Sequence, residues 1–199
     1  MERILSLPLT EKTVREIKAG DIVYLSGEIL QLTAAAHKRA LEHAAQGKPV
    51  PFDVENMAIY HCYTCFTEDN NGLECKFLGA TTSAGVNPFQ PAFIREFKVR
   101  AVVGKGGMDE ATLKAMQDVG CIYLAQVGGC TQICTEAAEK ITTKFWEDLG
   151  PNLAMKIVFN KLGPLVVGMD AHGNSIYDDT SKKTRENQKL IYKKIGIVS

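Results

Sequence analysis

Short apolar runs, glycine-rich loops and helix-like segments alternate through the middle of the chain, and this order restricts the fold more than any other feature. Residues 101–103 form a short apolar run that ends in the glycine-rich segment 104–107, and residues 109–120 then show the pattern of a capped amphipathic helix. The pattern repeats, with a strand predicted over 121–127 and a helix over about 131–140. Such repeats are typical of α/β domains, in which crossover helices join parallel strands.

The flanking segments contain more strand patterns than helix patterns. Helices are predicted over 10–17 and 33–46, the second with Thr33 as its N-cap. Gly27 is expected to end the first strand, and residues 69–72 are a turn that joins two strands of a hairpin. The strands predicted outside the middle region cover residues 22–26, 57–63, 75–78, 144–146, 154–159 and 165–169. These patterns predict a single α/β domain with mixed sheets.

The charge balance and the length argue against several classes of protein. The chain has 199 residues, of which 45% are apolar, so it can bury a sizeable core without disulfides or structural metal. Its 23 Lys and Arg balance 23 Asp and Glu, which argues against a general nucleic-acid or acidic-membrane binder. No apolar run approaches the roughly eighteen residues of a spanning helix, and the N-terminus lacks a signal-peptide block. We therefore expect a cytoplasmic protein that binds neither nucleic acid nor membrane.

The segment Gly104-Lys105-Gly106-Gly107 is the sharpest candidate for a binding site. Glycines let the backbone turn tightly and approach a ligand, and the helix that follows presents free N–H groups to an anion. Lys105 adds a positive charge, so the segment suits a carboxylate or a phosphate. Its spacing fits neither a P-loop nor a dinucleotide-binding fingerprint. The alternative is a tight strand-to-helix turn with a solvated lysine.

Two further polar clusters are candidates. Thr81-Thr82-Ser83 lies between glycine-containing segments, and its hydroxyls can donate to an oxyanion or relay a proton. Turn or cap hydrogen bonding is the alternative for this cluster. On the Ala-rich helix, His37 and Arg39 are two residues apart, so they do not share one helical face. Either one of them reaches a pocket, or both belong to a solvated cationic turn.

The six cysteines are expected as reduced thiols in a cytoplasmic protein. Cys62 and Cys65 form a C-x-x-C pair beside His61, with Cys75 ten residues further on. Such a set could bind zinc or an iron–sulfur cluster. A second pair with zinc-ribbon spacing is missing from the sequence, so buried free thiols are the alternative.

Eight segments occur in an order that resembles one enzyme family. They read KAGDIVYLSGEI, AAHKRALE, KPVPFDVENMAIYH, GATTS, VVGKGGM, VGGC, WEDLG and GPLVVGMDAHGN. Together they resemble the β subunit, or the fused C-terminal domain, of class I fumarases and L(+)-tartrate dehydratases, over about residues 10–178. The resemblance implies a swivelling three-layer β/β/α domain with mixed sheets, which we assign to residues 1–178. The charged residues 179–199 are then predicted as a helix or a tail.

The resemblance also implies a reaction and its participants. This family reversibly adds or removes water across a C–C bond of a small dicarboxylate or hydroxy acid, with a [4Fe–4S] cluster as Lewis acid. A partner α subunit carries the cluster, so the resemblance places no metal ligand on this chain. An α₂β₂ assembly is implied, and the chain by itself could form homo-oligomers. Because the sequence starts at Met1 without an upstream domain, we expect the α partner to be a separate chain.

Matched to the family's motifs, individual residues acquire expected roles. The GATTS segment makes Thr81 the proton-transfer hydroxyl, and VVGKGGM makes Lys105 a substrate-binding or base-supporting cation. The AHKR segment makes Arg39, together with His37, a carboxylate contact. The full set implied for substrate binding is His37, Arg39, Thr82, Gly104 and Gly106. Fixed cations of this kind suit a dianionic substrate and stabilise enolate-like charge.

Two positions depart from the family's pattern. Gly85 stands where the family usually has an arginine, so a bidentate carboxylate contact is missing. Residues 61–65 replace a segment that resembles Gly-Pro-Thr-Pro. These departures leave two alternatives open: a different substrate, or a catalytically inactive module that binds a metal or cluster or regulates a complex.

Overall fold

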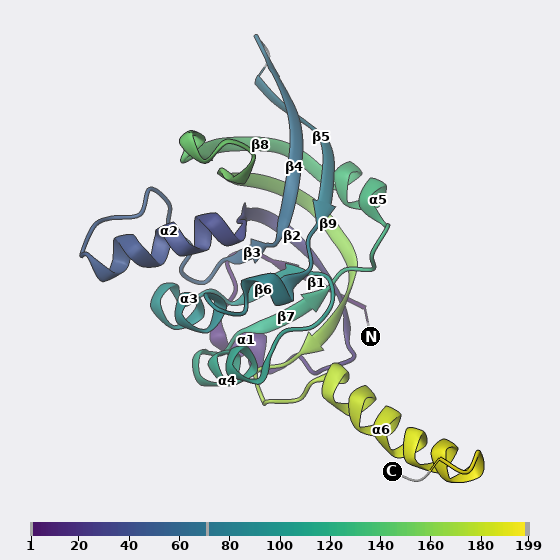
Figure 1. The fold of residues 1–199 in the computed structure, drawn as a ribbon. Helices are drawn as coiled ribbons and strands as arrows, with labels where there is room; N and C mark the ends of the chain where they lie inside the picture. The colour runs from purple at the N-terminus through teal and green to yellow at the C-terminus, as the bar shows by residue number, and fades with distance from the viewer. Residues whose placement is uncertain (1, 71, 198–199) are drawn as a thin grey trace.

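A closed sheet of five strands forms the centre of the molecule (Figure 1). The structure, a computed structural model, describes residues 2–70 and 72–197. Four parallel strands run in the order β2, β3, β6 and β7, and the long strand β9 pairs antiparallel with both β7 and β2. These strands cover Ile22–Gln31 (β2), Ala58–Tyr60 (β3), Ala101–Gly104 (β6), Ile122–Ala125 (β7) and Ala154–Met169 (β9).

The remaining elements surround this closed sheet. Strand β1 (Glu2–Ser6) pairs parallel with β2, and β8 (Ala138–Phe145) pairs with β9, while β4 (Cys62–Asp69) and β5 (Gly72–Ala80) form a separate hairpin. The α-helices are α1 (Glu11–Arg15), α2 (Ala34–Ala45), α3 (Gln90–Phe97), α4 (Glu110–Val119), α5 (Thr131–Glu136) and α6 (Ile176–Lys194); Ser83–Val86 and Glu147–Asn152 are short 3₁₀ helices. Figure 1 shows α2, α3 and α4 on one side of the sheet and α6 projecting from the body. No helix of the described ranges is long and apolar enough to cross a bilayer.

The mixed α/β class and the parallel crossovers predicted from the sequence are confirmed. The closed sheet does not clearly show the three-layer β/β/α arrangement that the resemblance implied, because β9 joins the two ends of the parallel sheet. The charged C-terminal region is helical, and this helix begins at Ile176, inside the range 1–178 that we assigned to the main domain.

Several predicted boundaries were wrong. The strand predicted over 57–63 is divided between β3 and β4, which belong to different sheets. Three further differences each have a local reason. Gly27 does not end β2; it has φ +120° and lies at a register irregularity inside the strand. The strands predicted at 154–159 and 165–169 are one strand, which passes through Gly163 at φ +151°. Helix α5 ends at Glu136, because the residues that follow pair with β9 as β8.

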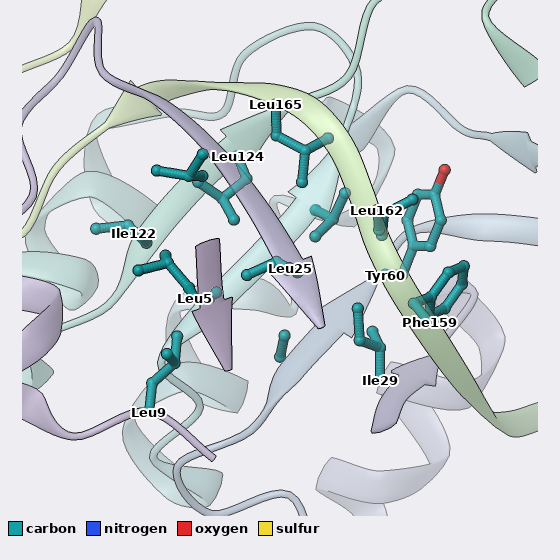
Figure 2. Close-up of a cluster of buried hydrophobic side chains, with 14 of the residues drawn as sticks. Leu5, Leu9, Leu25, Ile29, Tyr60, Ile122, Leu124, Phe159, Leu162 and Leu165 are labelled. Atoms are coloured by element: carbon teal, nitrogen blue, oxygen red, sulfur yellow. The ribbon is translucent and has the colours of Figure 1, made fainter. Parts of the chain in front are cut away.

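Alternate residues of the short central strands face two different apolar clusters. Tyr60, Val103 and Leu124 face the interior of the closed sheet. Figure 2 shows Tyr60 and Leu124 there with side chains of β2 and β9. Ile59 and Tyr123, one position away along their strands, face the cluster beneath α2, α3 and α4. Because both faces are covered, these strands are continuously apolar. The alternation fixes which side chains at the strand ends point toward the helices.

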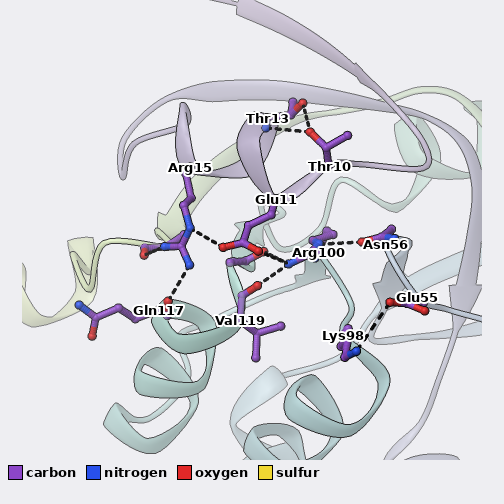
Figure 3. Close-up of polar contacts among 12 residues, drawn as sticks. Thr10, Glu11, Thr13, Arg15, Glu55, Asn56, Lys98, Arg100, Gln117 and Val119 are labelled. Carbon is purple, nitrogen blue, oxygen red and sulfur yellow. Dashed lines mark hydrogen bonds and ion pairs between the residues drawn. The ribbon is translucent and has the colours of Figure 1, made fainter.

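A polar corner attaches α1 to the end of α4 (Figure 3). The Arg100 guanidinium donates to Asn56 Oδ1 at 2.9 Å and to the carbonyls of Val119 and Gly120. Arg15 donates to the carbonyl of Gln117 in α4 at 3.2 Å and to Glu11 Oε1 at 2.8 Å. The hydrogen bond and charge of Arg15 lower the pKa of Glu11. These contacts hold the amino-terminal ends of β6 and β7, opposite the strand ends described below.

We predict that Leu25→Ala lowers the free energy of unfolding by about 2–5 kcal/mol, because Leu25 is fully buried inside the closed sheet. Ile4→Ala on β1 is the matched control; its side chain is 54% exposed, so its loss should be about 0.5 kcal/mol or less. Urea denaturation of the purified chain measures both. Equal losses for the two variants would contradict the core assignment.

Candidate active site

The candidate site lies where the parallel strands end. Strand β3 runs into His61, β6 runs into Lys105, and β7 runs into Gln126. The backbone ties these ends together, because His61 N donates to Val103 O at 2.8 Å and Gln126 N donates to Gly104 O at 2.7 Å. Ligands of open parallel sheets bind outside the carboxyl ends of the strands. The same edge of this closed sheet therefore gathers the sequence segments that were predicted to bind an anion.

Thr81-Thr82-Ser83 pairs with the glycine-rich segment as a short continuation of the sheet. Thr82 forms an isolated parallel bridge with Lys105. Ser83 N donates to Lys105 O at 3.0 Å, and Lys105 N donates to Thr81 O at 3.3 Å. On its other side, Thr81 N donates to His61 O at 2.8 Å. Two segments that are more than twenty residues apart in the sequence are thereby held side by side, with Thr82 exposed and Thr81 and Lys105 partly exposed.

The glycines around Lys105 serve two different needs. A side chain at Gly104 would collide with Ser83 Oγ and would come within 3.3 Å of the Tyr123 hydroxyl, so only glycine fits. Gly106 is exposed and has φ +74°, the left-handed conformation that glycine adopts without strain. Within 2–70 and 72–197, no partner accepts the backbone N–H of Gly106 or Gly107. These donors, with the Lys105 ammonium, suit an anionic ligand.

The helix that follows contributes less to this anion site than predicted. The Asp109 side chain caps α4 by accepting from Thr112 N at 2.9 Å. A carboxylate of the protein therefore already occupies the first turn, where the sequence had suggested that a ligand anion would bind. The loop residues 104–107, rather than the helix end, are the available anion-binding element.

His37 lies beneath the site and has no exposed surface. Its Nδ1 is 2.8 Å from Thr33 O, and its ring packs 4.6 Å from the Phe93 ring and 5.2 Å from the His61 ring, measured between centroids. Burial lowers the pKa of His37 to about 4. His37 is thus a neutral, buried side chain in this structure, and its predicted contact with a substrate carboxylate remains untested.

Arg39 lies on a different face of α2 from His37. Its Nη1 is 2.7 Å from Asp148 Oδ2, and its guanidinium carbon is 5.7 Å from the centre of the Trp146 ring. No contact within the described part of the chain joins Arg39 to Thr81 or Lys105. The structure therefore brings together Thr81, Thr82 and the 104–106 segment from the predicted set, with His37 beneath them, but does not bring Arg39 to them.

A buried polar network behind Thr81 and Lys105 was missed by the sequence analysis. His61 Nδ1 is 2.9 Å from Ser83 Oγ, His61 Nε2 is 3.0 Å from Gln90 Oε1, and Tyr123 donates its hydroxyl proton to Ser83 Oγ at 3.0 Å. Desolvation, with the neighbouring His37, lowers the pKa of His61 to about 3. In the sequence, His61 stood out only as a neighbour of Cys62, and Ser83 only as the third hydroxyl of its cluster. Their contact depends on pairing between strands that no local pattern reveals.

The cysteines do not form a metal centre within the described residues. All six are free thiols; Cys62 is buried, Cys75 is partly exposed and Cys65 is exposed. No group of three His, Cys, Asp or Glu side chains in the described ranges is placed to hold a metal ion. Burial raises the pKa of Cys62, Cys75, Cys121 and Cys134, which disfavours the thiolate needed for metal binding or redox chemistry.

Comparison with known proteins agrees with the arrangement of these segments. The model of the family described as "Fumarase C-terminus" matches residues 2–180. This chain belongs to that family. A Methanocaldococcus jannaschii protein with the provisional name L(+)-tartrate dehydratase subunit beta is 38% identical over 180 residues, covering 89% of this chain and 92% of the relative. The family resemblance inferred from the eight segments is confirmed.

Two further relatives are named for tartrate dehydratase and for fumarate hydratase. The L(+)-tartrate dehydratase subunit beta of Escherichia coli is 29% identical over 196 residues, which cover 98% of this chain and 96% of that protein. A Geobacillus stearothermophilus protein, provisionally named fumarate hydratase class I, is 37% identical over 183 residues, which cover 92% of this chain but 35% of that protein. The family thus includes stand-alone β subunits and matching parts of longer proteins.

We predict that the protein loses stability as the pH falls from about 6.5 to about 4 because of His37, and to about 3 because of His61. Both have pKa values below the ordinary value in the fold, about 4 and about 3, so the unfolded chain binds more protons in this range and stability rises with pH. Lowering the pH from 7 to 5 should cost about 1–2 kcal/mol per histidine. Urea denaturation at several pH values measures this slope, and His37→Gln should reduce it by about half, because His61 still contributes. An unchanged slope in that variant would contradict the assignment.

Gly104→Ala tests the close packing beneath Lys105. The added methyl group has to displace Ser83, so we expect a loss of about 1–3 kcal/mol in the free energy of unfolding. Gly85→Ala is the matched control, because no atom lies within 4 Å of the position its methyl group would take. Urea denaturation compares the two. A Gly104→Ala variant as stable as Gly85→Ala would show that the loop is not packed in this way.

Proposed function

We propose that this chain is the β component of an iron–sulfur-dependent hydro-lyase that adds or removes water on a small dicarboxylate or hydroxy acid. Family membership and the names of the relatives support this reading. The observation that carries it is the pairing of Thr82 with Lys105, which holds hydroxyls, an ammonium group and backbone N–H groups at one strand edge. This combination suits a reaction that moves a proton beside a carboxylate.

In this proposal, Lys105 and the loop bind one substrate carboxylate. The ammonium group supplies the charge, and the N–H groups of Gly106 and Gly107 supply fixed donors. Removing a proton from the carbon beside that carboxylate builds enolate-like negative charge on its oxygens. The same groups stabilise this charge as it develops, which lowers the barrier for the proton transfer.

The proposed role of Thr81 is to relay that proton: its oxygen accepts the proton from the carbon while its own hydroxyl proton passes to the departing hydroxide, which leaves as water. Thr82 is a neighbouring substrate contact. Dehydration removes the proton from one carbon and hydroxide from the next, and hydration reverses both steps. Arg39 remains a proposed contact for a second carboxylate. Because Arg39 now pairs with Asp148, that carboxylate would have to compete with the protein's own.

The [4Fe–4S] cluster belongs, in this proposal, to a partner α subunit, where it would act as a Lewis acid on the substrate hydroxyl. The described residues of this chain do not fit such a cluster, because no three of their candidate ligands are placed to hold a metal. The work proposed for this chain is therefore binding, charge stabilisation and proton transfer by its own side chains.

We predict that Lys105→Met reduces kcat/KM at least a hundredfold in the complex with the α subunit, because it removes the charge at the carboxylate. Thr81→Val should reduce kcat by a similar factor, since it keeps the shape and removes the hydroxyl. Lys114→Met on the exposed side of α4 is the matched control and should leave turnover unchanged.

The measurement is anaerobic co-purification with the α subunit, followed by dehydration assays on a panel of dicarboxylates and hydroxy acids. Turnover that depends on Lys105 and Thr81 supports the proposal and identifies the substrate. If both variants keep the turnover of the unchanged protein, Lys105 and Thr81 do not carry the proposed chemistry. A stable complex without turnover on any substrate would favour an inactive regulatory subunit, and iron bound to this chain alone would favour a cluster-binding module.

A further inference from the structure

We infer that His61 is a positioning residue that holds the Thr81-Thr82-Ser83 segment against Lys105 through a hydrogen bond accepted from Ser83. This inference rests on the proposed function, because the segment it positions is the proposed proton-transfer and binding segment. His61 itself touches no substrate, since it has no exposed surface. Its effect reaches the site through Ser83, which is also fully buried and is next to Thr82 in the chain.

His61 contacts the segment through its backbone and its side chain. Its carbonyl accepts the Thr81 N–H at 2.8 Å, and its ring nitrogen Nδ1 lies 2.9 Å from Ser83 Oγ. The backbone contact fixes the start of the segment and the ring contact fixes its end. Because Ser83 N also donates to Lys105 O at 3.0 Å, the position of Ser83 sets the register between the hydroxyl segment and the lysine.

The hydrogen bonds of the network have a consistent direction. The Tyr123 hydroxyl donates to Ser83 Oγ, so the Ser83 proton is free to point at His61 Nδ1. His61 Nε2 then carries the ring proton and donates it to Gln90 Oε1 at 3.0 Å. Along this path Ser83 Oγ accepts once and donates once, and the His61 ring does the same. Only the neutral ring with its proton on Nε2 satisfies both neighbours.

The second buried histidine, His37, lies beside this network, with its ring centroid 5.2 Å from that of His61. With Gln90 Oε1 toward His61, the Gln90 amide nitrogen Nε2 is a donor; within the described residues, it and His37 Nε2 are both buried without a hydrogen-bond partner. His37 Nδ1 lies 2.8 Å from the carbonyl of Thr33, so the His37 proton belongs on Nδ1 and its Nε2 is an acceptor. The two histidines should therefore hold opposite tautomers.

The surroundings exclude water and leave little freedom to the network. His61, Ser83, Gln90, His37 and Tyr123 have no exposed surface. Gly104 is packed so closely beneath Ser83 that a β-carbon would not fit there, and it would also come within 3.4 Å of His61 Cβ. In such an environment a lost hydrogen bond is not replaced by solvent, so the loop is expected to shift instead.

Two variants of His61 separate positioning from folding. Asparagine can place its amide oxygen near the position of the ring Nδ1 and can still accept from Ser83, whereas glutamine reaches the position of Nε2 and cannot. We expect His61→Gln to lower kcat about tenfold or more with a small change in KM, and His61→Asn to recover most of that loss. Thermal unfolding of both variants must show a folded protein at the assay temperature.

Ser83→Ala provides an independent test of the same link. If His61 acts through Ser83, the kcat losses of His61→Gln and Ser83→Ala will not add, and the double variant will be no slower than the worse single variant. Additive losses would overturn the inference. So would a His61→Gln variant with unchanged kcat, or a His61→Asn variant that recovers nothing while remaining folded.

Nitrogen NMR of the full chain gives a readout that does not depend on activity. We expect the His61 ring protonated on Nε2 and the His37 ring protonated on Nδ1, each neutral at pH 7. A His61 ring protonated on Nδ1, or on both nitrogens, would overturn the inference. The Lys105→Met variant separates this failure from that of the proposed function: if Lys105→Met lowers turnover and His61→Gln does not, only the positioning role fails.

Discussion

The pairing of β9 with both β2 and β7 is the contact on which the rest of the structure depends. Strands β3, β6 and β7 have only three or four residues each, too few to form a stable sheet alone. Strand β9 joins the two ends of this short parallel sheet, with Phe159 opposite Gly27 and Val167 opposite Leu124. Closure encloses the inner face of the short strands, while α2, α3 and α4 cover the outer face. It also fixes where the carboxyl ends of these strands lie relative to one another.

Closure requires β9 to bend, and the bend includes a position that only glycine can occupy without strain. Gly163 has φ +151°, and a β-carbon there would lie 2.8 Å from Tyr24 Cδ1. Beside it, Lys161 has φ +54° and donates its N–H to Ser26 Oγ at 3.0 Å. These local features explain why the sequence looked like two strands. The apolar pattern is interrupted where the strand turns, although its backbone continues.

Local patterns predicted the elements well and their long-range contacts poorly. The caps of α2 and α4, Thr33 and Asp109, were identified because capping depends on neighbours three residues away. The contact between Thr82 and Lys105 could be expected only from the family resemblance, since it joins two separate strand ends. The contact of His61 with Ser83 was not expected at all. Nothing near a single histidine in a sequence shows that a distant serine and tyrosine will face it.

The exposure of the candidate site explains why this chain would need a partner in the proposed reaction. The network behind the site is buried, but Thr82 and Gly106 are exposed and Lys105 is partly exposed. An ammonium group in water attracts a carboxylate only weakly, because solvent screens the charge and competes for the hydrogen bonds. Covering the site would remove that water and strengthen each interaction with the developing charge. In the proposed reaction, the chain would supply a preorganised half of an active site, and the surface that covers it would complete the chemistry.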